Sequence, residues 1–246
     1  MAMHRFANPA QFNRLADAIL PWAQGAFVLL LGAGLYISFF DSPPDYQQGE
    51  SVRVMYIHVP AAWMSMFTYM VMAVASFTAL VWRHPLALLA GRAAAPIGAV
   101  FTALALITGM LWGKPMWGTY WVWDGRLTSV LVLHFLYLGY MALWQAIDEE
   151  EKAGRAASIL ALVGVVNIPI IKFSVDWWST LHQPASVMRL DGPTIDGSML
   201  TPLLLMAGAY QAYFAVVFLW RMKLEINRRK LAVARQVAMH APVGAE

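Results

Sequence analysis

Two histidines and a run of tryptophans are the residues whose types and spacing could support chemistry in this chain. His58 lies two residues before Pro60, and His182 follows the pair Trp177 and Trp178. A neutral imidazole can bind a metal or move a proton, and it can also simply donate a hydrogen bond. Either histidine alone is typical of a hydrogen-bonded residue at a helix end or in a loop.

The tryptophan-rich segment lies between the two histidines in the sequence. Residues 117–128 read Trp-Gly-Thr-Tyr-Trp-Val-Trp-Asp-Gly-Arg-Leu-Thr. If this segment is helical, Trp117, Trp121 and Asp124 share one face, bordered by Tyr120. Tryptophans also form belts at membrane surfaces, but a belt needs fewer rings than the four indoles between residues 112 and 123. The excess favours a bound ligand that is flat and apolar.

A porphyrin is a flat ligand that suits this combination of residue types. Imidazole is a common axial ligand of heme iron, so His58 and His182 are the candidate iron ligands. Indoles can cover the faces and edges of the ring. Arg53 or Arg126 could pair with the propionates, because a guanidinium binds a carboxylate with two hydrogen bonds. Asp124 is expected to orient a histidine, an arginine or the loop backbone.

The composition indicates a membrane protein. The chain has 246 residues, of which 60% are hydrophobic and 13% are charged, whereas soluble domains carry roughly 25% charged residues. The absence of cysteine excludes disulfides, thiolate metal sites and covalent thioether attachment of heme to this chain. Residues 1–21 do not resemble a cleaved signal peptide.

The long apolar segments predict an all-α integral membrane protein, a single six-helix domain over residues 1–246. Residues 8–20 are expected to form a separate short helix on the membrane surface. The expected spans are 22–40, 54–82, 93–112, 127–147, 156–173 and 199–220. The other segments are the tryptophan-rich loop 113–126, a second loop on the same side (174–198) and a basic tail (221–246).

Basic residues predict the orientation of these spans. Twelve Lys and Arg lie in the terminal regions and even loops, against five in or beside the odd loops. The positive-inside rule therefore places both termini in the cytoplasm and the tryptophan-rich loop outside. The tryptophans then divide into single residues at the inner ends of helices and a crowded outer aromatic cluster. That cluster comprises Trp112, Trp117, Trp121, Trp123, Trp177 and Trp178, with Trp63 nearby; the inner residues are Trp22, Trp82, Trp144 and Trp220.

Other polar residues in the spans have a simpler explanation. His134 lies in the outer half of the fourth span, where an ionisable residue is a functional candidate, but a neutral histidine bonded to a neighbouring helix is favoured. Asn167 and Gln211 are expected to form hydrogen bonds between helices. No G-x-x-x-x-G-K-[ST] motif occurs, so the chain is not expected to hydrolyse ATP through a P-loop.

Three of these segments together resemble one known family. Residues 117–128 resemble the tryptophan-rich "WWD" signature of heme-handling membrane proteins. Residues 55–63 (MYIHVPAAW) and 177–184 (WWSTLHQP) resemble two further signatures of the heme exporter protein C family (CcmC), the C component of system I cytochrome c maturation. The match covers most of the chain in order. This sequence departs from the family at Tyr120, where Trp is frequent, and at Gly125, where Ala is common.

The resemblance implies a function and a set of partners. It implies that His58 and His182 ligate heme b, held non-covalently at the periplasmic face of the bacterial inner membrane. Trp117, Tyr120, Trp121 and Trp123 would contact this heme, which would pass to the heme chaperone CcmE. The implied neighbours are the ABC transporter subunits CcmA and CcmB and the small membrane subunit CcmD. The resemblance also implies that the chain is not an enzyme.

Two other classes of function stay open at this point. The chain could be an intramembrane enzyme that uses His58 and His182 as metal ligands or bases, although neither a carboxylate pair nor a nucleophile accompanies them. It could also be a structural subunit of an ABC transporter, in which the aromatic residues pack against protein. A heme absorption band in the purified protein would separate binding from scaffolding.

Overall fold

The computed structural model describes residues 8–178, 180–182, 186–187, 189 and 191–240, which form helices joined by loops. Six helical segments among them are long and apolar enough to cross a membrane, which confirms the predicted all-α membrane fold. The elements are α1 (Pro9–Tyr36), the π-helix η2 (Ile37–Asp41), the 3-10 helix η3 (Glu50–Val54), α2 (Met55–Trp82), α3 (Pro85–Trp117), α4 (Gly125–Ala146), α5 (Glu150–Gly164), α6 (Asn167–Trp177) and α7 (Gly197–His240).

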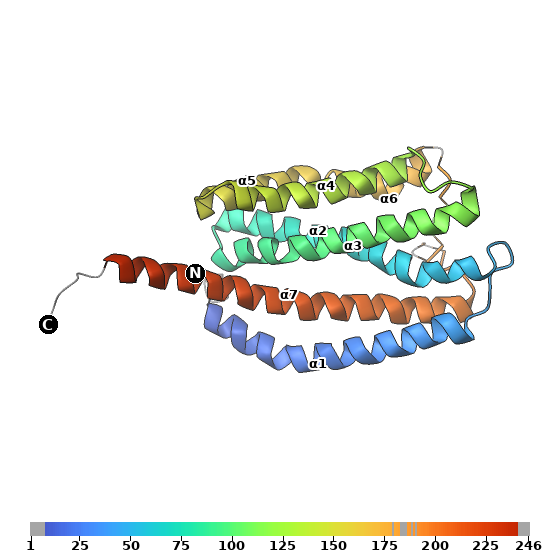
Figure 1. Ribbon diagram of the computed structural model, residues 1–246, viewed down its shortest axis with the longest axis horizontal. Coiled ribbons are helices and arrows are strands. Elements are labelled where there is room, and N and C mark those ends of the chain that lie inside the picture. Colours follow the sequence, from blue (N-terminus) through green and yellow to red (C-terminus); the bar gives the residue numbers. More distant parts are fainter. Residues whose placement is uncertain (1–7, 179, 183–185, 188, 190, 241–246) are drawn as a thin grey trace.

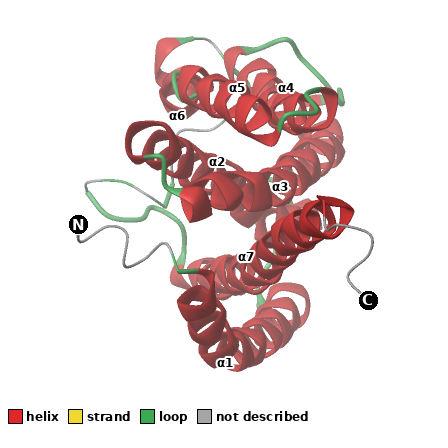
Figure 2. Cartoon of the chain, turned by 90° about the vertical axis from the view of Figure 1, so that its left-hand side faces the viewer, coloured by secondary structure: helices red, strands yellow, loops and turns green. Residues whose placement is uncertain are grey.

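The helices lie side by side along one common direction and form a layered bundle (Figures 1 and 2). The centre of the bundle is the pair α2 and α3. On one side α4 packs on α3, and α5 and α6 pack on α4; on the other side α7 contacts α2 and α3 and carries α1 on its outer face. The loops between η2 and η3, between α3 and α4 and between α6 and α7 meet at one end, which we call the loop end. The start of α1 and the end of α7 lie at the opposite end, which we call the terminal end.

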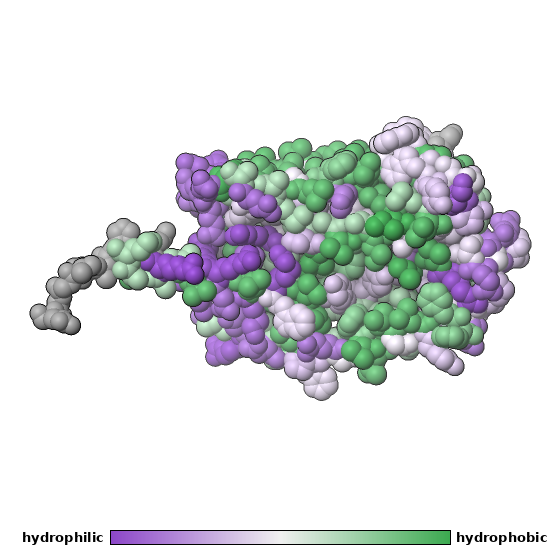
Figure 3. Space-filling view, in the orientation of Figure 1, coloured by the Kyte–Doolittle hydropathy of each residue, from purple (hydrophilic) through white to green (hydrophobic). Residues whose placement is uncertain are grey.

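The surface of the bundle matches a membrane environment. In Figure 3 a broad hydrophobic band lies between two ends that carry most of the polar residues. Many large apolar side chains of the six membrane-capable segments are exposed, including Leu29, Val74 and Phe135. Such exposure is costly in water but favourable against lipid tails. The chain is therefore a multi-pass membrane protein.

Several helices extend beyond the predicted spans. The separate surface helix predicted for residues 8–20 is wrong, because α1 is continuous from Pro9 to Tyr36 with Pro21 inside it. Asn8 begins α1 by accepting a hydrogen bond from the amide of Ala10 (2.9 Å), as N-cap residues do. Residues 85–92, predicted as part of a loop, already belong to α3.

The predicted fifth span is two helices in sequence. α5 ends at Gly164 and α6 begins at Asn167, and Pro169 lies in the first turn of α6, where a missing amide is tolerated. Asn167 lies at the break and donates through Nδ2 to the carbonyl of Ser129 on α4 (2.9 Å). The prediction of an interhelical hydrogen bond at Asn167 is thus confirmed.

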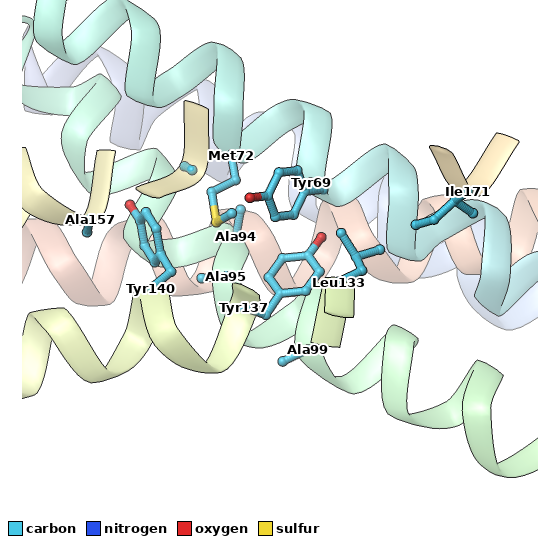
Figure 4. Packing of buried hydrophobic residues seen from close by; sticks show 11 residues of the cluster. Tyr69, Met72, Ala94, Ala95, Ala99, Leu133, Tyr137, Tyr140, Ala157 and Ile171 are labelled. Carbon is cyan, nitrogen blue, oxygen red and sulfur yellow. The ribbon is translucent and has the colours of Figure 1, made fainter. Parts of the chain in front are cut away.

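Tyrosines packed against small residues form the centre of the bundle (Figure 4). Tyr69, Tyr137 and Tyr140 are almost fully buried, and the Tyr137 hydroxyl donates to the carbonyl of Ser65 (2.8 Å). A Cβ atom at Gly98 would lie only 2.1 Å from the Tyr137 ring, so glycine is required for α4 to pack this closely on α3. Tyr137 of α4 thus contacts both α2 and α3, so the core fixes how the helix that carries His58 (α2) lies against the helices that flank the tryptophan-rich loop (α3 and α4).

A group of charges joins the helices at the terminal end. The buried Glu225 of α7 pairs with Arg92 of α3 (3.4 Å) and with Arg228 (3.2 Å). The Arg92 guanidinium also lies over the Trp144 ring, 4.6 Å from its centroid. Trp144, predicted as an ordinary belt residue, is thus part of a packed cation–π contact. The other three inner tryptophans are largely exposed (Trp22, Trp82 and Trp220).

Candidate functional site

His58 lies in the first turns of α2 at the loop end, and its ring packs against α3. Nδ1 of His58 is 3.1 Å from the Thr108 hydroxyl, and the Trp112 ring stands edge-on to the imidazole at 5.7 Å between centroids. A Cβ atom at Gly109 would come within 2.9 Å of the imidazole. The glycine therefore leaves the space that the histidine occupies between the two helices.

The hydrogen bonds around Thr108 assign the proton on the His58 ring. The Thr108 hydroxyl donates its own proton to the carbonyl of Leu104 (2.6 Å). It can then only accept from His58, so Nδ1 of the neutral imidazole carries the proton. Nε2 keeps its lone pair and is the nitrogen available for a metal.

His182 lies in the loop between α6 and α7, and its partners arrange its ring in the same way. Its Nδ1 is 3.4 Å from Asp124 Oδ2 and 3.3 Å from the Thr180 hydroxyl. The Thr180 hydroxyl donates to the Asp124 carboxylate, so both neighbours of Nδ1 act as acceptors. The Nε2 atom of His182 therefore also keeps its lone pair. The Trp117 ring packs edge-on to this imidazole at 4.9 Å.

Asp124 connects this loop to the start of α4. Its Oδ1 accepts from the amide of Leu127 (2.7 Å) and caps the helix, while Oδ2 faces Thr180 and His182. Burial of Asp124 opposes its ionisation, but the hydrogen bonds from Thr180 and Leu127 outweigh this effect and hold the pKa of the carboxyl below its ordinary value. Burial also lowers the pKa of His182, against the opposing effect of Asp124, so His182 is neutral near pH 7. Of the partners predicted for Asp124 (a histidine, an arginine or the loop backbone), the structure places His182 beside it, and the amide from which it accepts belongs to α4.

The structure brings the two histidines and one arginine into a common region. His182, in the loop before α7, and Arg126, on α4, both lie close enough to His58 of α2 to affect its ionisation. Nε of Arg126 donates to the Ser174 hydroxyl on α6 (2.9 Å). Asp124 and Asp176 lie near the same guanidinium.

Arg53 has a different environment from Arg126. Its Nε bonds the Glu50 carboxylate (2.5 Å), and its Nη1 donates to the carbonyl of Ser38 (2.6 Å). These contacts join η3 to η2 and leave the side chain only 17% exposed. Of the two arginines predicted as propionate partners, Arg53 is thus bonded within η2 and η3, whereas Arg126 lies near His58.

The tryptophan-rich segment is not the helix considered above. α3 continues through Trp117 and ends at Gly118, whose φ of 75° is favourable only for glycine among common residues. Residues 118–124 then form an irregular loop, so Trp117, Trp121 and Asp124 do not share a helix face. Trp121 and Trp123 pack edge-on at 5.4 Å, and the Lys114 ammonium lies over the Tyr120 ring at 5.2 Å.

Large parts of the outer aromatic cluster are accessible at the loop end. The exposed fraction is 77% for Trp123, 54% for Tyr120, 56% for Trp177 and 51% for Trp178. Trp177 and Trp178 pack edge-on against each other at 5.8 Å. By contrast, Nε1 of Trp121 is buried and has no hydrogen-bond partner among the described residues. A buried indole N–H without a partner is unusual in proteins.

The other histidines do not add to this site. In the described part of the chain, no group of three or more His, Cys, Asp or Glu side chains is placed to hold a bare metal ion. A porphyrin supplies the equatorial ligands of its iron itself, so two axial histidines are sufficient for heme. The predicted interhelical bond of His134 is not found: its Nδ1 is buried without a partner in the described residues. His84 accepts the amide of Ala87 at the terminal end, and His4 lies outside the described residues.

Sequence reasoning missed the two threonines that hold the histidines. Thr180 precedes His182 by two residues, a spacing at which hydroxyls commonly bond the nearby backbone; here it accepts from the His182 amide at 3.2 Å. Thr108 precedes Trp112 by four residues and so shares its helix face. Its contact with His58 depends on how α2 and α3 pack, which no local pattern reveals. Ser179, Gln183 and Pro184 of the third signature lie outside the described residues.

Comparison with known proteins gives one consistent result. The family model described as heme exporter protein C matches residues 2–237. The chain is 58% identical over 231 residues to the heme exporter protein C of Bradyrhizobium diazoefficiens, covering 94% of this chain and 88% of the relative. It is 51% identical over 221 residues to the protein of that name from Escherichia coli K12, covering 90% and 89%. It is also 48% identical over 190 residues to a protein of Marchantia polymorpha named putative cytochrome c biosynthesis ccmC-like mitochondrial protein. This match covers 77% of this chain and 80% of the relative. The chain therefore belongs to the heme exporter protein C family.

Proposed function

We propose that this protein binds heme b non-covalently at the loop end and delivers it for the maturation of c-type cytochromes. His58 and His182 are the axial ligands in this proposal. The observation that carries it is the matched environment of the two imidazoles. In each ring Nδ1 faces acceptors, which are the Thr108 hydroxyl for His58 and the Thr180 hydroxyl with the Asp124 carboxylate for His182, and this leaves Nε2 for iron.

The surroundings of the histidines support a porphyrin better than a bare metal ion. Trp117 packs on His182 and Trp112 on His58, so aromatic surface adjoins both ligands. Arg126 supplies a positive charge near His58, which suits a propionate. Tyr120, Trp123, Trp177 and Trp178 extend this surface toward the outside of the bundle.

The remaining parts of the proposal concern location and partners. The excess of basic residues at the terminal end supports cytoplasmic termini and a loop end in the periplasm, with the chain in the inner membrane of a bacterium. Heme then passes to the periplasmic chaperone CcmE. A complex with the transporter subunits CcmA and CcmB and the small subunit CcmD supports this transfer, since this chain contains no P-loop of its own.

One observation favours a second candidate function. Trp123 is 77% exposed and Trp178 is 51% exposed, and exposed aromatic groups are also typical of protein interfaces. In that case the loop end packs against another subunit, and the chain is a structural part of an ABC transporter. This candidate requires no heme and gives the paired histidines no role.

Absorption spectroscopy of the purified protein tests the proposal. Protein from heme-competent cells should show a Soret band and a six-coordinate, low-spin spectrum. His58→Ala or His182→Ala should open one axial position, shift the spectrum and reduce transfer to the chaperone, and added imidazole should partly restore the spectrum. His84→Ala, at the terminal end, is the control. A double variant of His58 and His182 with an unchanged spectrum and normal delivery would show that the ligand assignment is wrong.

A further inference from the structure

The hydroxyl of Thr108 is the only polar side chain within hydrogen-bond distance of the His58 ring among the described residues. It lies on α3, fifty positions along the chain from His58, and the Thr108 oxygen is 3.1 Å from Nδ1. The contact joins the two helices at the centre of the bundle, α2 and α3. A substitution at Thr108 therefore changes the surroundings of His58 without altering the histidine.

The position of Thr108 is fixed by hydrogen bonds within its own helix. Its hydroxyl donates to the carbonyl of Leu104 at 2.6 Å and lies 3.3 Å from that of Ala105, so the side chain is held against its own helix. The adjacent Gly109 lets the imidazole approach the α3 backbone. Together, Thr108 and Gly109 determine both the position and the orientation of the His58 ring.

The orientation of the His58 ring matters because a histidine binds iron through one nitrogen at a time. In free solution a neutral imidazole exchanges its proton between Nδ1 and Nε2, and the protonated nitrogen cannot ligate. An acceptor at Nδ1 keeps the proton there and presents Nε2. Residues that hold the second nitrogen of a ligating histidine change metal affinity by about 10- to 100-fold when they are removed.

We propose that Thr108 is the positioning residue for His58: by accepting from Nδ1–H, it holds Nε2 toward the heme iron. This inference rests on the proposed function, because it takes His58 as an axial ligand. It adds a residue outside the three sequence signatures and gives it a role that is independent of direct contact with heme.

The test compares the loss of a threonine hydroxyl at two positions of α3, Thr108 and Thr102. Thr108→Val keeps the shape of the side chain and removes the hydroxyl acceptor, so that the backbone carbonyl of Ala105 is the acceptor left near His58, whereas Thr108→Ser keeps the hydroxyl. Thr102→Val is the matched control, because Thr102 donates to the Gly98 carbonyl at 2.6 Å in the same way but is packed in the core. The heme-loaded full-length proteins are compared by their low-spin fraction and by the rate at which heme passes to excess apomyoglobin.

Thr108→Val should lower the low-spin fraction and release heme about tenfold faster, while Thr108→Ser and Thr102→Val should behave like the original protein. If Thr108→Val folds poorly, Thr108→Ala replaces it, with Thr102→Ala as its control. Equal behaviour of the Thr108 and Thr102 variants, with a clear effect of His58→Ala, overturns the role of Thr108 alone. An unchanged spectrum in His58→Ala itself overturns the proposed function and this inference together.

Discussion

Asp124 and His182 are joined across 58 positions of the chain, with the carboxylate Oδ2 at 3.4 Å from the imidazole Nδ1. The same carboxylate caps α4 through its other oxygen. A single side chain therefore connects the tryptophan-rich loop, a membrane-spanning helix and a candidate iron ligand. His58 is held differently, because the Thr108 hydroxyl that faces it carries no charge.

Asp124→Asn separates the two roles of Asp124. Asparagine is a good N-cap, so α4 should keep its stability, but the negative charge beside His182 is lost. We expect heme affinity to fall about 10- to 100-fold and the reduction potential of the heme to rise, because an anionic partner stabilises the ferric state. Asp124→Ala should lose the cap as well and about 1 kcal/mol of stability. Redox titration and thermal unfolding measure the two effects, and an Asn variant with unchanged potential would contradict the role of the charge.

The tryptophans at the two ends should differ in their effect on heme. Replacing Trp121 and Trp123 with Ala removes an edge-on pair from the loop end and should weaken heme binding by about 1 kcal/mol per ring, roughly fivefold each. Trp82→Ala and Trp220→Ala remove exposed rings near the terminal end and should mainly affect insertion or stability. The measurement is heme bound per folded protein. Equal losses in both sets would remove the distinction between a ligand surface and a membrane belt.

Substitutions of Arg126 and Arg53 should have different effects, the first on heme binding and the second on stability. Arg126→Gln removes the positive charge near His58 and should weaken heme binding by about 2 kcal/mol, the value of a hydrogen bond to a charged group. Arg53→Gln should instead lower the melting temperature, because the Ser38 carbonyl and Glu50 lose their partner. Heme titration and thermal unfolding of each variant give the comparison. A larger loss of heme affinity in the Arg53 variant would reverse the assignment.

The orientation of the bundle can be tested with reporter fusions. The excess of basic residues in the terminal regions predicts that fusions at Gln48, Gly118 and Gly192, all at the loop end, report the periplasm. Fusions at Arg83 and Glu150, which lie at the terminal end, should report the cytoplasm. A periplasmic signal at Glu150 would invert the topology and place the heme site on the wrong side for the proposed chaperone.

The number of spans could be predicted from the sequence because it depends on the length and polarity of apolar runs, which are local properties. The end of α3 could also be predicted in part, because a glycine such as Gly118 that follows a last turn with a basic residue such as Lys114 commonly ends a helix. The possibility that residues 117–124 are helical did not take this glycine into account. The continuity of α1 through Pro21 was harder to predict. Leu20 and Ala16 are buried against the bundle, and this packing favours a continuous helix despite the proline.

The site was predictable only as a set of residue types. The sequence shows that His58, His182 and the tryptophans exist in one chain, and motif order relates them to a family. It does not show that Thr108 faces His58, because that contact depends on the register between α2 and α3. The register in turn depends on the core, where Tyr137 of α4 packs on Gly98 of α3 and donates to the Ser65 carbonyl of α2, and this effect appears only when the helices are packed.

Gly98→Ala tests this dependence of the site on the core. The new Cβ atom would lie 2.1 Å from the Tyr137 ring, so α3 and α4 must separate or the tyrosine must move, at a cost of about 1 to 3 kcal/mol. Gly32→Ala is the matched control, because no atom lies within 4 Å of its new Cβ and alanine is the better helix former. Thermal unfolding in detergent should show a lower melting temperature for Gly98→Ala and an unchanged or higher one for Gly32→Ala. Because α3 also carries Thr108, the low-spin fraction of bound heme should fall in the Gly98 variant alone. A Gly98 variant as stable as the Gly32 variant would mean that the core tolerates a wider spacing of these helices, and the close packing would then not fix the site.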